Sequence, residues 1–269
     1  MCLIGFALDA HDDFVLVVAA NRDEYYARDS AAASWWADGA TVWGGRDQVA
    51  GGSWLAVDRR GRLAAVTNVR EPSPAPARRS RGELVADFVS GNAALDDYAT
   101  TVASRAGHYA GFNLLLFDPA SSRPARYVSN RHPQRVLEVP AGVHGLSNHL
   151  LGTAWPKVRR LTGRLRGAIE DPDAPLETLL LGALADRSLP PDDELPDTGI
   201  GLPRERVLAP AMIAAPELGY GTRASTLVAI RRDGRVEAIE RSWAPGTHAP
   251  RIAGERRTRF TAARRTPVR

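Results

Sequence analysis

The sequence predicts an α+β protein built in layers, organised as a single domain over residues 1–269. Strand-like apolar runs open the chain, amphipathic helical segments follow, and strand-like runs return near the end. No internal repeat and no flexible linker divides the 269 residues. A chain of this length can enclose one large hydrophobic core.

Composition favours a soluble protein and argues against several classes of partner. Hydrophobic residues make up 44% and charged residues 25% of the chain, as in ordinary globular proteins. The net charge of +4 comes almost entirely from scattered arginines, so no nucleic-acid partner is expected. The one cysteine, Cys2, excludes an internal disulfide and a thiolate zinc site. The opening apolar run ends at Asp9 and is too short to span a bilayer, so we expect a cytoplasmic protein without stable membrane insertion.

Two β-hairpins are expected in the first quarter of the chain. "LIGFAL" and "FVLVVAA" flank the polar turn "DAHDD", and both runs are almost wholly apolar. Both faces of their sheet are therefore expected to be covered. "GSWLAVDRRGRLAAVTN", residues 52–68, predicts the second hairpin, with "DRRG" as its turn.

Helices are expected in the middle of the chain, on both sides of a further group of strands. "SRGE" predicts a capping box that starts a helix at Ser80, and residues 94–105 predict a second helix. The strands expected next are "GFNLLLFD", "ARYVSN", "RVLEVP" and "GVHGLSN". A helix then follows with Thr153 as its N-cap and Pro156 in its first turn.

The last third predicts one more helix, a long loop and returning strands. Residues 176–185 predict the helix, and the proline-rich and acidic residues 190–206 predict the loop. "AMIAAP", "STLVAIRRDGRVEAIERSW" and "RTRFTAA" predict strands, with a turn at "DG" inside the second of these segments.

Cys2 is a candidate nucleophile because it follows the start methionine directly. Removal of that methionine would leave Cys2 with both a thiol and a free α-amine, which titrates at about pH 8. One residue would then supply a nucleophile and its own general base. The alternative is that Cys2 is a small buried hydrophobic residue in this position by chance.

Polar residues at strand ends support the catalytic interpretation. Asn21, Arg22 and Asp23 follow the second strand of the first hairpin, which returns them beside the N-terminus. Asp23 could there accept hydrogen bonds from the α-amine. Asn68 and Asn148 close two other predicted strands, where their amides could stabilise an oxyanion or cap the next element.

A set of collinear motifs is spread over residues 21–243: "NRDE", "GGSWLAV…RGRLAAVTN", "RSRGELV", "YAGFNLL", "GLSN…W", "YGTR…T" and "ERSW". Together these motifs resemble the NRDE family, which is the transport and Golgi organisation 2 family. The resemblance implies an αββα sandwich of the N-terminal-nucleophile hydrolase type, with choloylglycine hydrolases and penicillin acylases as similar enzymes. It places Cys2, Asp23, Asn68 and Asn148 at the catalytic positions of that pattern.

One departure from the pattern concerns the arginine beside the thiolate. Similar hydrolases carry an arginine three residues before the aspartate, where this chain has Ala20. In an extended segment Arg22 and Asp23 point to opposite faces, which favours a structural role for Arg22. Arg223, in "YGTR", is a candidate replacement. We expect the ligand-binding residues to be Asn21, Arg22, Trp54 and Arg223.

Three functions compete at this point. The first is hydrolysis of a linear amide by Cys2, which requires no cofactor or metal. The second, implied by the resemblance, is carriage of haem or a lipid-like ligand, with the tryptophans as a pocket lining and a cysteine or histidine as a haem ligand. The residues concerned are Trp35, Trp36, Trp43, Trp54, Cys2, His144 and His149. The third is an interaction module in which the basic run 78–82 meets an acidic protein partner of unknown identity.

Overall fold

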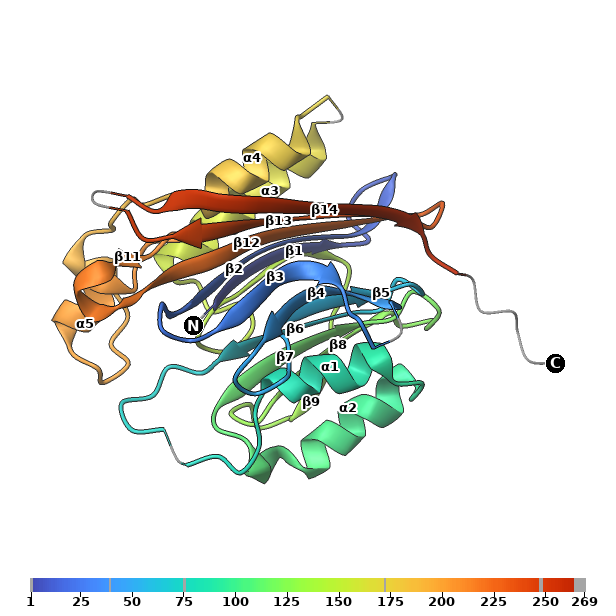
Figure 1. The fold of residues 1–269 in the computed structure, drawn as a ribbon, viewed down its shortest axis with the longest axis horizontal. Helices are drawn as coiled ribbons and strands as arrows, with labels where there is room; N and C mark the ends of the chain where they lie inside the picture. Colours follow the sequence, from blue (N-terminus) through green and yellow to red (C-terminus); the bar gives the residue numbers. More distant parts are fainter. Residues whose placement is uncertain (1, 39, 75, 172, 247–248, 264–269) are drawn as a thin grey trace.

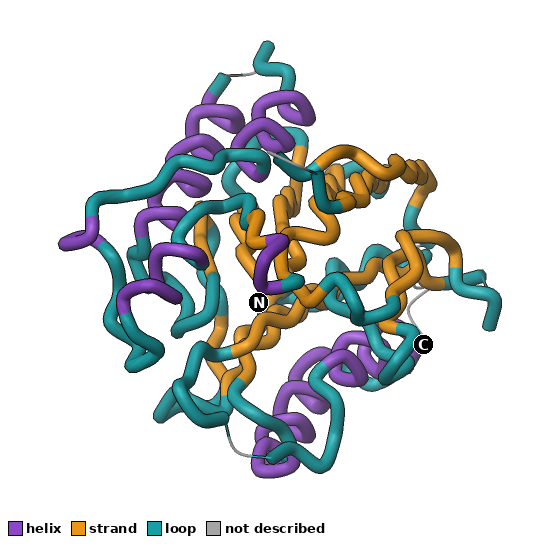
Figure 2. Tube along the Cα trace, turned by 60° about the vertical axis from the view of Figure 1, so that its left-hand side comes forward, coloured by secondary structure: helices purple, strands orange, loops and turns teal. Residues whose placement is uncertain are grey.

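The computed structural model describes residues 2–38, 40–74, 76–171, 173–246 and 249–263. Within these ranges the chain forms two seven-stranded antiparallel sheets that stack face to face between two layers of helices (Figures 1 and 2). Sheet A contains, in spatial order, β10 (Gly142–Leu146), β1 (Cys2–Leu8), β2 (Phe14–Tyr25), β12 (Tyr220–Arg231), β13 (Arg235–Ala244) and β14 (Arg251–Thr261), with β11 (Ala214–Ala215) paired to β12. Sheet B contains β3 (Ser30–Trp35), β4 (Val42–Asp47), β5 (Leu55–Asp58), β6 (Leu63–Asn68), β7 (Phe112–Phe117), β8 (Ala125–Ser129) and β9 (Val136–Glu138).

The helices cover the outer faces of the sheets, as Figure 1 shows. α1 (Gly82–Ser90) and α2 (Leu95–Ser104) pack on sheet B, and α3 (Pro156–Glu170) and α4 (Leu176–Leu184) pack on sheet A. The other helical segments are α5 (Leu202–Val207) and the single turns η1 (Ala106–His108), η2 (Asp192–Glu194) and η3 (Pro216–Leu218).

Successive side chains of β1 and β2 point to opposite faces of sheet A and so enter two different hydrophobic cores. Ile4 and Phe6 point into the core between the two sheets, whereas Leu3 and Ala7 point into the core beneath α3 and α4. A third core lies between sheet B and the α1–α2 layer. The nearly continuous apolar character of the first hairpin follows from this burial on both faces, and the predicted α+β αββα sandwich is confirmed.

Several predicted boundaries are wrong in detail. α1 begins at Gly82 with Arg81 as its N-cap, and the hydroxyl of Ser80 accepts only a 3.3 Å bond from the Gly82 N–H. α3 begins at Pro156 with Trp155 as its N-cap, so Thr153 does not cap it. The segment "AMIAAP" contributes only the two residues of β11, and the predicted loop 190–206 contains η2 and the start of α5.

Candidate functional site

Cys2 begins β1, half-buried at the edge of the core between the sheets. It pairs across the β1–β2 ladder with Arg22, and directly opposite residues in antiparallel strands share a face. The thiol and the Arg22 guanidinium therefore lie on the same face of sheet A, the face that meets sheet B. Arg22, for which a structural role was favoured and which was also expected to bind ligand, is thus the cross-strand neighbour of the thiol.

Asp23 contacts Cys2 through its backbone and points its side chain to the other face. Its backbone N–H favours the thiolate form of Cys2, while its carboxylate accepts a 2.7 Å bond from the Thr222 hydroxyl. Burial raises the pKa of the Cys2 thiol, and the Asp23 carboxylate adds to that rise, whereas the Arg22 charge opposes it. The thiol is thus protonated at neutral pH, and attack on a carbonyl requires a base to accept its proton.

The two asparagines join the same cluster from different sheets. Asn148, fully buried just beyond β10, donates from Nδ2 to the backbone oxygen of Asn68 at the end of β6, at 3.1 Å. The hydroxyl of Ser147 bonds both to the Cys2 carbonyl oxygen, at 3.0 Å, and to Asn148 Oδ1, at 3.3 Å. Thr67 donates to the Ser147 carbonyl at 2.7 Å and ties the ends of β6 and β10 together. The structure therefore brings all four expected catalytic residues into one region.

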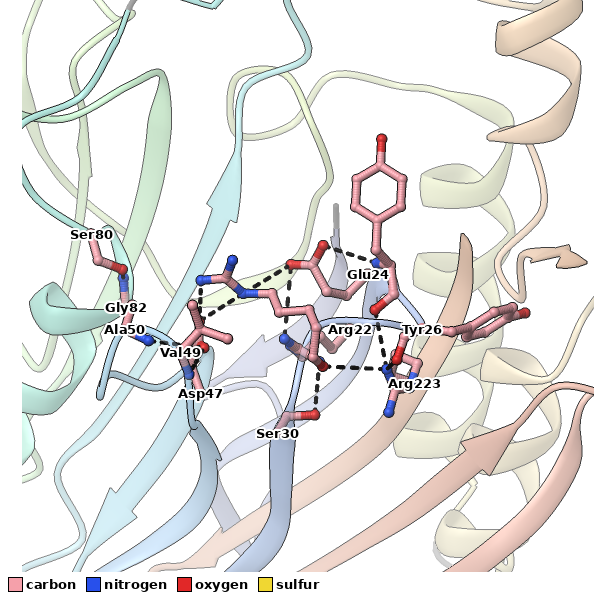
Figure 3. A network of polar contacts seen from close by, with 12 residues as sticks. Arg22, Glu24, Tyr26, Ser30, Asp47, Val49, Ala50, Ser80, Gly82 and Arg223 are labelled. Carbon is pink, nitrogen blue, oxygen red and sulfur yellow. Dashed lines mark hydrogen bonds and ion pairs between the residues drawn. The ribbon is translucent and has the colours of Figure 1, made fainter. Parts of the chain in front are cut away.

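Three of the four expected ligand-binding residues line one cavity, and Asn21 does not. The inter-sheet cavity has a volume of about 680 Å³ and lies between β3 and the strands β12–β14. The Arg22 guanidinium lies 4.4 Å above the ring of Trp54, and Gly45 leaves room for that ring, since a Cβ there would come within 2.0 Å of it. Arg223 sits at a bulge in β12 and donates to the carbonyls of Tyr25 and Tyr26. Figure 3 shows Arg223 bonded to the backbone of Tyr26, with Arg22 beside Glu24 and Ser30.

Asn21 is hydrogen-bonded on the opposite face of β2. Its Nδ2 donates to the carbonyls of Leu184 and Ala211, both at 2.8 Å, and its Oδ1 accepts from Ser225 at 2.6 Å. These bonds occupy both amide hydrogens and hold β2 against α4. The geometry suits an anchor for the helix layer better than a ligand contact.

The four expected pocket tryptophans separate in the structure. Only Trp54 lines the inter-sheet cavity. Trp43 is in the core between the sheets, Trp36 is in the core beneath α1, and Trp35 packs edge-on against Phe260. Trp243, from the motif "ERSW", lines the cavity instead.

A buried cationic group beneath Asp23 was not expected from the sequence. Lys157, in the first turn of α3, is 2% exposed and donates from Nζ to the Leu208 carbonyl at 2.9 Å. Burial lowers its pKa to about 8, and Asp23 is the strongest of the charges that oppose this. Burial likewise raises the pKa of Asp23, and Lys157 is the strongest opposing charge there. Lys157 thus favours the ionised form of Asp23.

A buried ion pair adds to this polar group. Arg70 is bonded to Glu205, and its guanidinium stacks 4.6 Å above the ring of Trp155. The backbone N–H of Arg70 donates to the Asn148 carbonyl at 2.7 Å, which connects the ion pair to Asn148. Lys157 is the only lysine in the sequence, and this was the one available signal for it. Nothing in the local sequence indicates that its side chain is buried.

Arg81 is a second residue that sequence reasoning missed. It lies half-buried just before α1, inside the run 78–82 that was considered as a surface for an acidic partner, and donates to the Gly111 carbonyl at 3.1 Å. Burial lowers its pKa, and Cys2 is the strongest of the charges that oppose this. Arg81 is therefore within electrostatic range of Cys2.

Two features are absent from the described residues. They contain no group of three or more histidine, cysteine, aspartate or glutamate side chains placed to hold a metal ion. In the same part of the chain, no helix has the length and apolar character needed to cross a bilayer.

The comparisons with known proteins agree with the motifs and the fold. The family profile described as Transport and Golgi organisation 2 matches residues 1–245. The chain belongs to this family. The mouse Transport and Golgi organization 2 homolog is 32% identical over 256 residues, covering 90% of this chain and 93% of its own. The Drosophila melanogaster Transport and Golgi organization protein 2 is 29% identical over 265 residues, covering 89% of this chain and 91% of its own.

The family's fold resembles that of a solved hydrolase. The Caenorhabditis elegans N-acylethanolamine-hydrolyzing acid amidase ortholog superposes with a TM-score of 0.51, covering 84% of this chain and 92% of its own. Sequence identity is 9%, so this similarity establishes the shared N-terminal-nucleophile fold and nothing about substrate. In this member of the Transport and Golgi organisation 2 family, the strand that opens that fold begins with Cys2.

Proposed function

We propose that this protein is an N-terminal-cysteine amidohydrolase that cleaves a linear C–N amide bond. The observation that carries the proposal is the convergence of Cys2, Asp23 and Asn148 from three strand ends into one cluster. The proposal requires removal of Met1, which lies outside the described residues.

The reaction follows from the positions of these groups. The free α-amine of Cys2 accepts the thiol proton as sulfur attacks the amide carbon, and the asparagine amides stabilise the resulting oxyanion. The same amine then donates its proton to the leaving nitrogen, the C–N bond breaks, and a thioester remains on Cys2. Water, activated by the amine, attacks the thioester, and the carboxylic acid and the free thiol are released. Asp23, whose ionised form the Lys157 charge favours against the effect of burial, orients the ammonium form of the amine.

The test is acylation of the N-terminal peptide. Incubation with an activated amide, followed by mass spectrometry, is expected to show an acyl group on Cys2 and free amine product. Cys2→Ala is expected to lose both. A matched control keeps one uncleavable residue before Cys2, so that the thiol is retained while its amine is blocked. Equal turnover in this control would refute the mechanism.

The alternative function is carriage of haem or a lipid-like ligand in the same cleft. The geometry gives it less support, because His144 bonds to the Pro140 carbonyl and His149 to Thr153, and neither histidine lines the inter-sheet cavity. A haem titration followed by absorbance, on the wild type and on Cys2→Ala, separates the alternatives. A thiolate-type spectrum lost in the variant, with no amide turnover in the wild type, would favour carriage.

A further inference from the structure

The inter-sheet cavity adjoins the thiol along one row of sheet A. Cys2 pairs with Arg22, and Arg22 pairs with Ala224 on its other side. The row continues through Ser242 to Gly254. Opposite residues in such pairs lie about 5 Å apart at Cβ, so Arg22 borders both the thiol and the cavity. A substrate whose carbonyl reaches Cys2 can place its other end beyond Arg22.

Two like charges meet at the wall of this cavity. Arg22 is 5% exposed, and the cavity lining includes both Arg22 and Arg223. Burial lowers the pKa of Arg223, and the Arg22 charge is the strongest further influence in the same direction. Two guanidinium groups that repel each other at a cavity wall are stabilised when an anion binds between or beside them.

The acidic residues near the cavity neutralise this pair only in part, and the Arg22 charge acts on Glu240 by opposing the rise in its pKa. The Glu240 carboxyl accepts from the Ala33 N–H at 2.7 Å and from the Thr226 hydroxyl at 3.2 Å. Glu255 is engaged by Arg241 and Arg257, each at 2.8 Å. Glu24, outside the cavity lining, forms an ion pair with Arg22 at 3.8 Å, and its charge also opposes the fall in the pKa of Arg223. The lining itself contains Arg22, Arg223 and Arg256 against two glutamates, so the cavity presents excess positive charge.

Aromatic surfaces flank the charged pair. Trp54 lies under the Arg22 guanidinium, and Trp243 lines the opposite side from β13, where its Nε1 donates to Ser225 at 2.9 Å. A ligand with an anionic end and an apolar body matches this lining.

We propose that the inter-sheet cavity is an anion subsite, in which Arg22 and Arg223 bind a carboxylate carried by the amide substrate. This inference rests on the proposed function for the scissile bond, and it adds the charge of the substrate. Planar guanidinium groups bind carboxylates through paired N–H···O bonds, which gives direction as well as affinity.

The test compares three probes that differ only in end-group charge. N-hexanoyl-γ-aminobutyrate, its terminal alcohol and N-hexanoylputrescine are titrated calorimetrically into Cys2→Ala, so that turnover does not disturb binding. The carboxylate is expected to bind about tenfold more tightly than the alcohol, the scale of one charge-assisted contact, and the cation is expected to bind least. Arg223→Met is expected to reduce the preference. Arg235→Met, an exposed control at a hairpin turn distant from the cavity lining, is expected to keep it.

The outcomes separate this inference from the proposed function. Equal affinity for the three probes, or binding of none, overturns the anion subsite even where native Cys2 hydrolyses an amide. Preference for the carboxylate with no acylation of native Cys2 supports the subsite and removes the hydrolase. The probe series is measured on unsubstituted arginines, so the comparison stands if an arginine variant fails to fold.

Discussion

At the scale of single residues, the contribution of Glu240 to the free energy of unfolding depends on pH. Its carboxyl links the sheets by accepting from the Ala33 N–H of β3, and burial raises its pKa from 4.5 to about 7. Between these values the folded protein holds a proton that the unfolded chain has lost. The contribution of Glu240 to the free energy of unfolding is therefore complete below about pH 4.5 and is lost as pH rises through 7.

Glu240→Gln tests this dependence. The amide keeps the acceptor for Ala33 and removes the ionisation, so the variant is expected to be more stable than the wild type at pH 8 by up to about 3 kcal/mol. At pH 4 the two proteins are expected to be nearly equal. Denaturant unfolding at both pH values measures the difference. A constant gap across this range would contradict the assignment.

At the scale of elements, the packing of α3 on sheet A depends on two paired glycines. Gly5 and Gly145 face each other across the β1–β10 ladder. A Cβ at Gly5 would come within 2.8 Å of Leu161, and one at Gly145 within 2.4 Å of Val158. Because neither glycine has a side chain, α3 packs close to β1 at this point and brings the buried Lys157 with it.

Gly145→Ala tests this close packing of α3 on sheet A, and Gly163→Ala is its control. The added methyl at position 145 meets the side chains of α3, and we expect a loss of about 1–3 kcal/mol from overpacking. Position 163 lies in the same helix with open space around it, and alanine there is expected to stabilise by about 0.5–1 kcal/mol through helix propensity. Thermal unfolding of both variants gives the comparison. A neutral result at 145 would show that α3 can shift away without cost.

The elements also show where sequence reasoning succeeds and where it stops. Both early hairpins were predictable because apolar runs flank recognisable turns. β3 and β4 were not predicted, because a register irregularity between Ala31 and Ser34 interrupts the alternation of β3. β4 carries Gly44 and Gly45, which its close neighbours require and which weaken its strand signal. The candidate catalytic residues followed from motifs, whereas the position of Lys157 depends on burial by distant segments.

At the scale of the whole molecule, the two sheets share one core. Side chains from β1, β2, β12 and β13 of sheet A and from β4–β8 of sheet B meet in it, with Phe6, Trp43 and Tyr127 fully buried there. If one sheet unfolds, the inner apolar face of the other sheet is exposed to water. The organisation as a single domain stays a prediction, and this shared core supports it.

Cooperative unfolding is the corresponding test. Tryptophan fluorescence reports mainly on sheet B, and far-UV circular dichroism reports on the helices of both outer layers. We expect the two signals to change together at one denaturant concentration. Separate midpoints would mean that one layer unfolds independently, and would contradict the single-domain prediction.

The burial of Lys157 has a practical consequence for labelling. It carries the chain's one lysine side-chain amine, which is buried in the first turn of α3 and donates a hydrogen bond to the Leu208 carbonyl. Acylating dyes applied to the native protein are therefore directed to the α-amino group. Stoichiometric modification of the intact protein would tag the N-terminal residue selectively. Identifying the tagged residue would show whether it is cysteine or methionine.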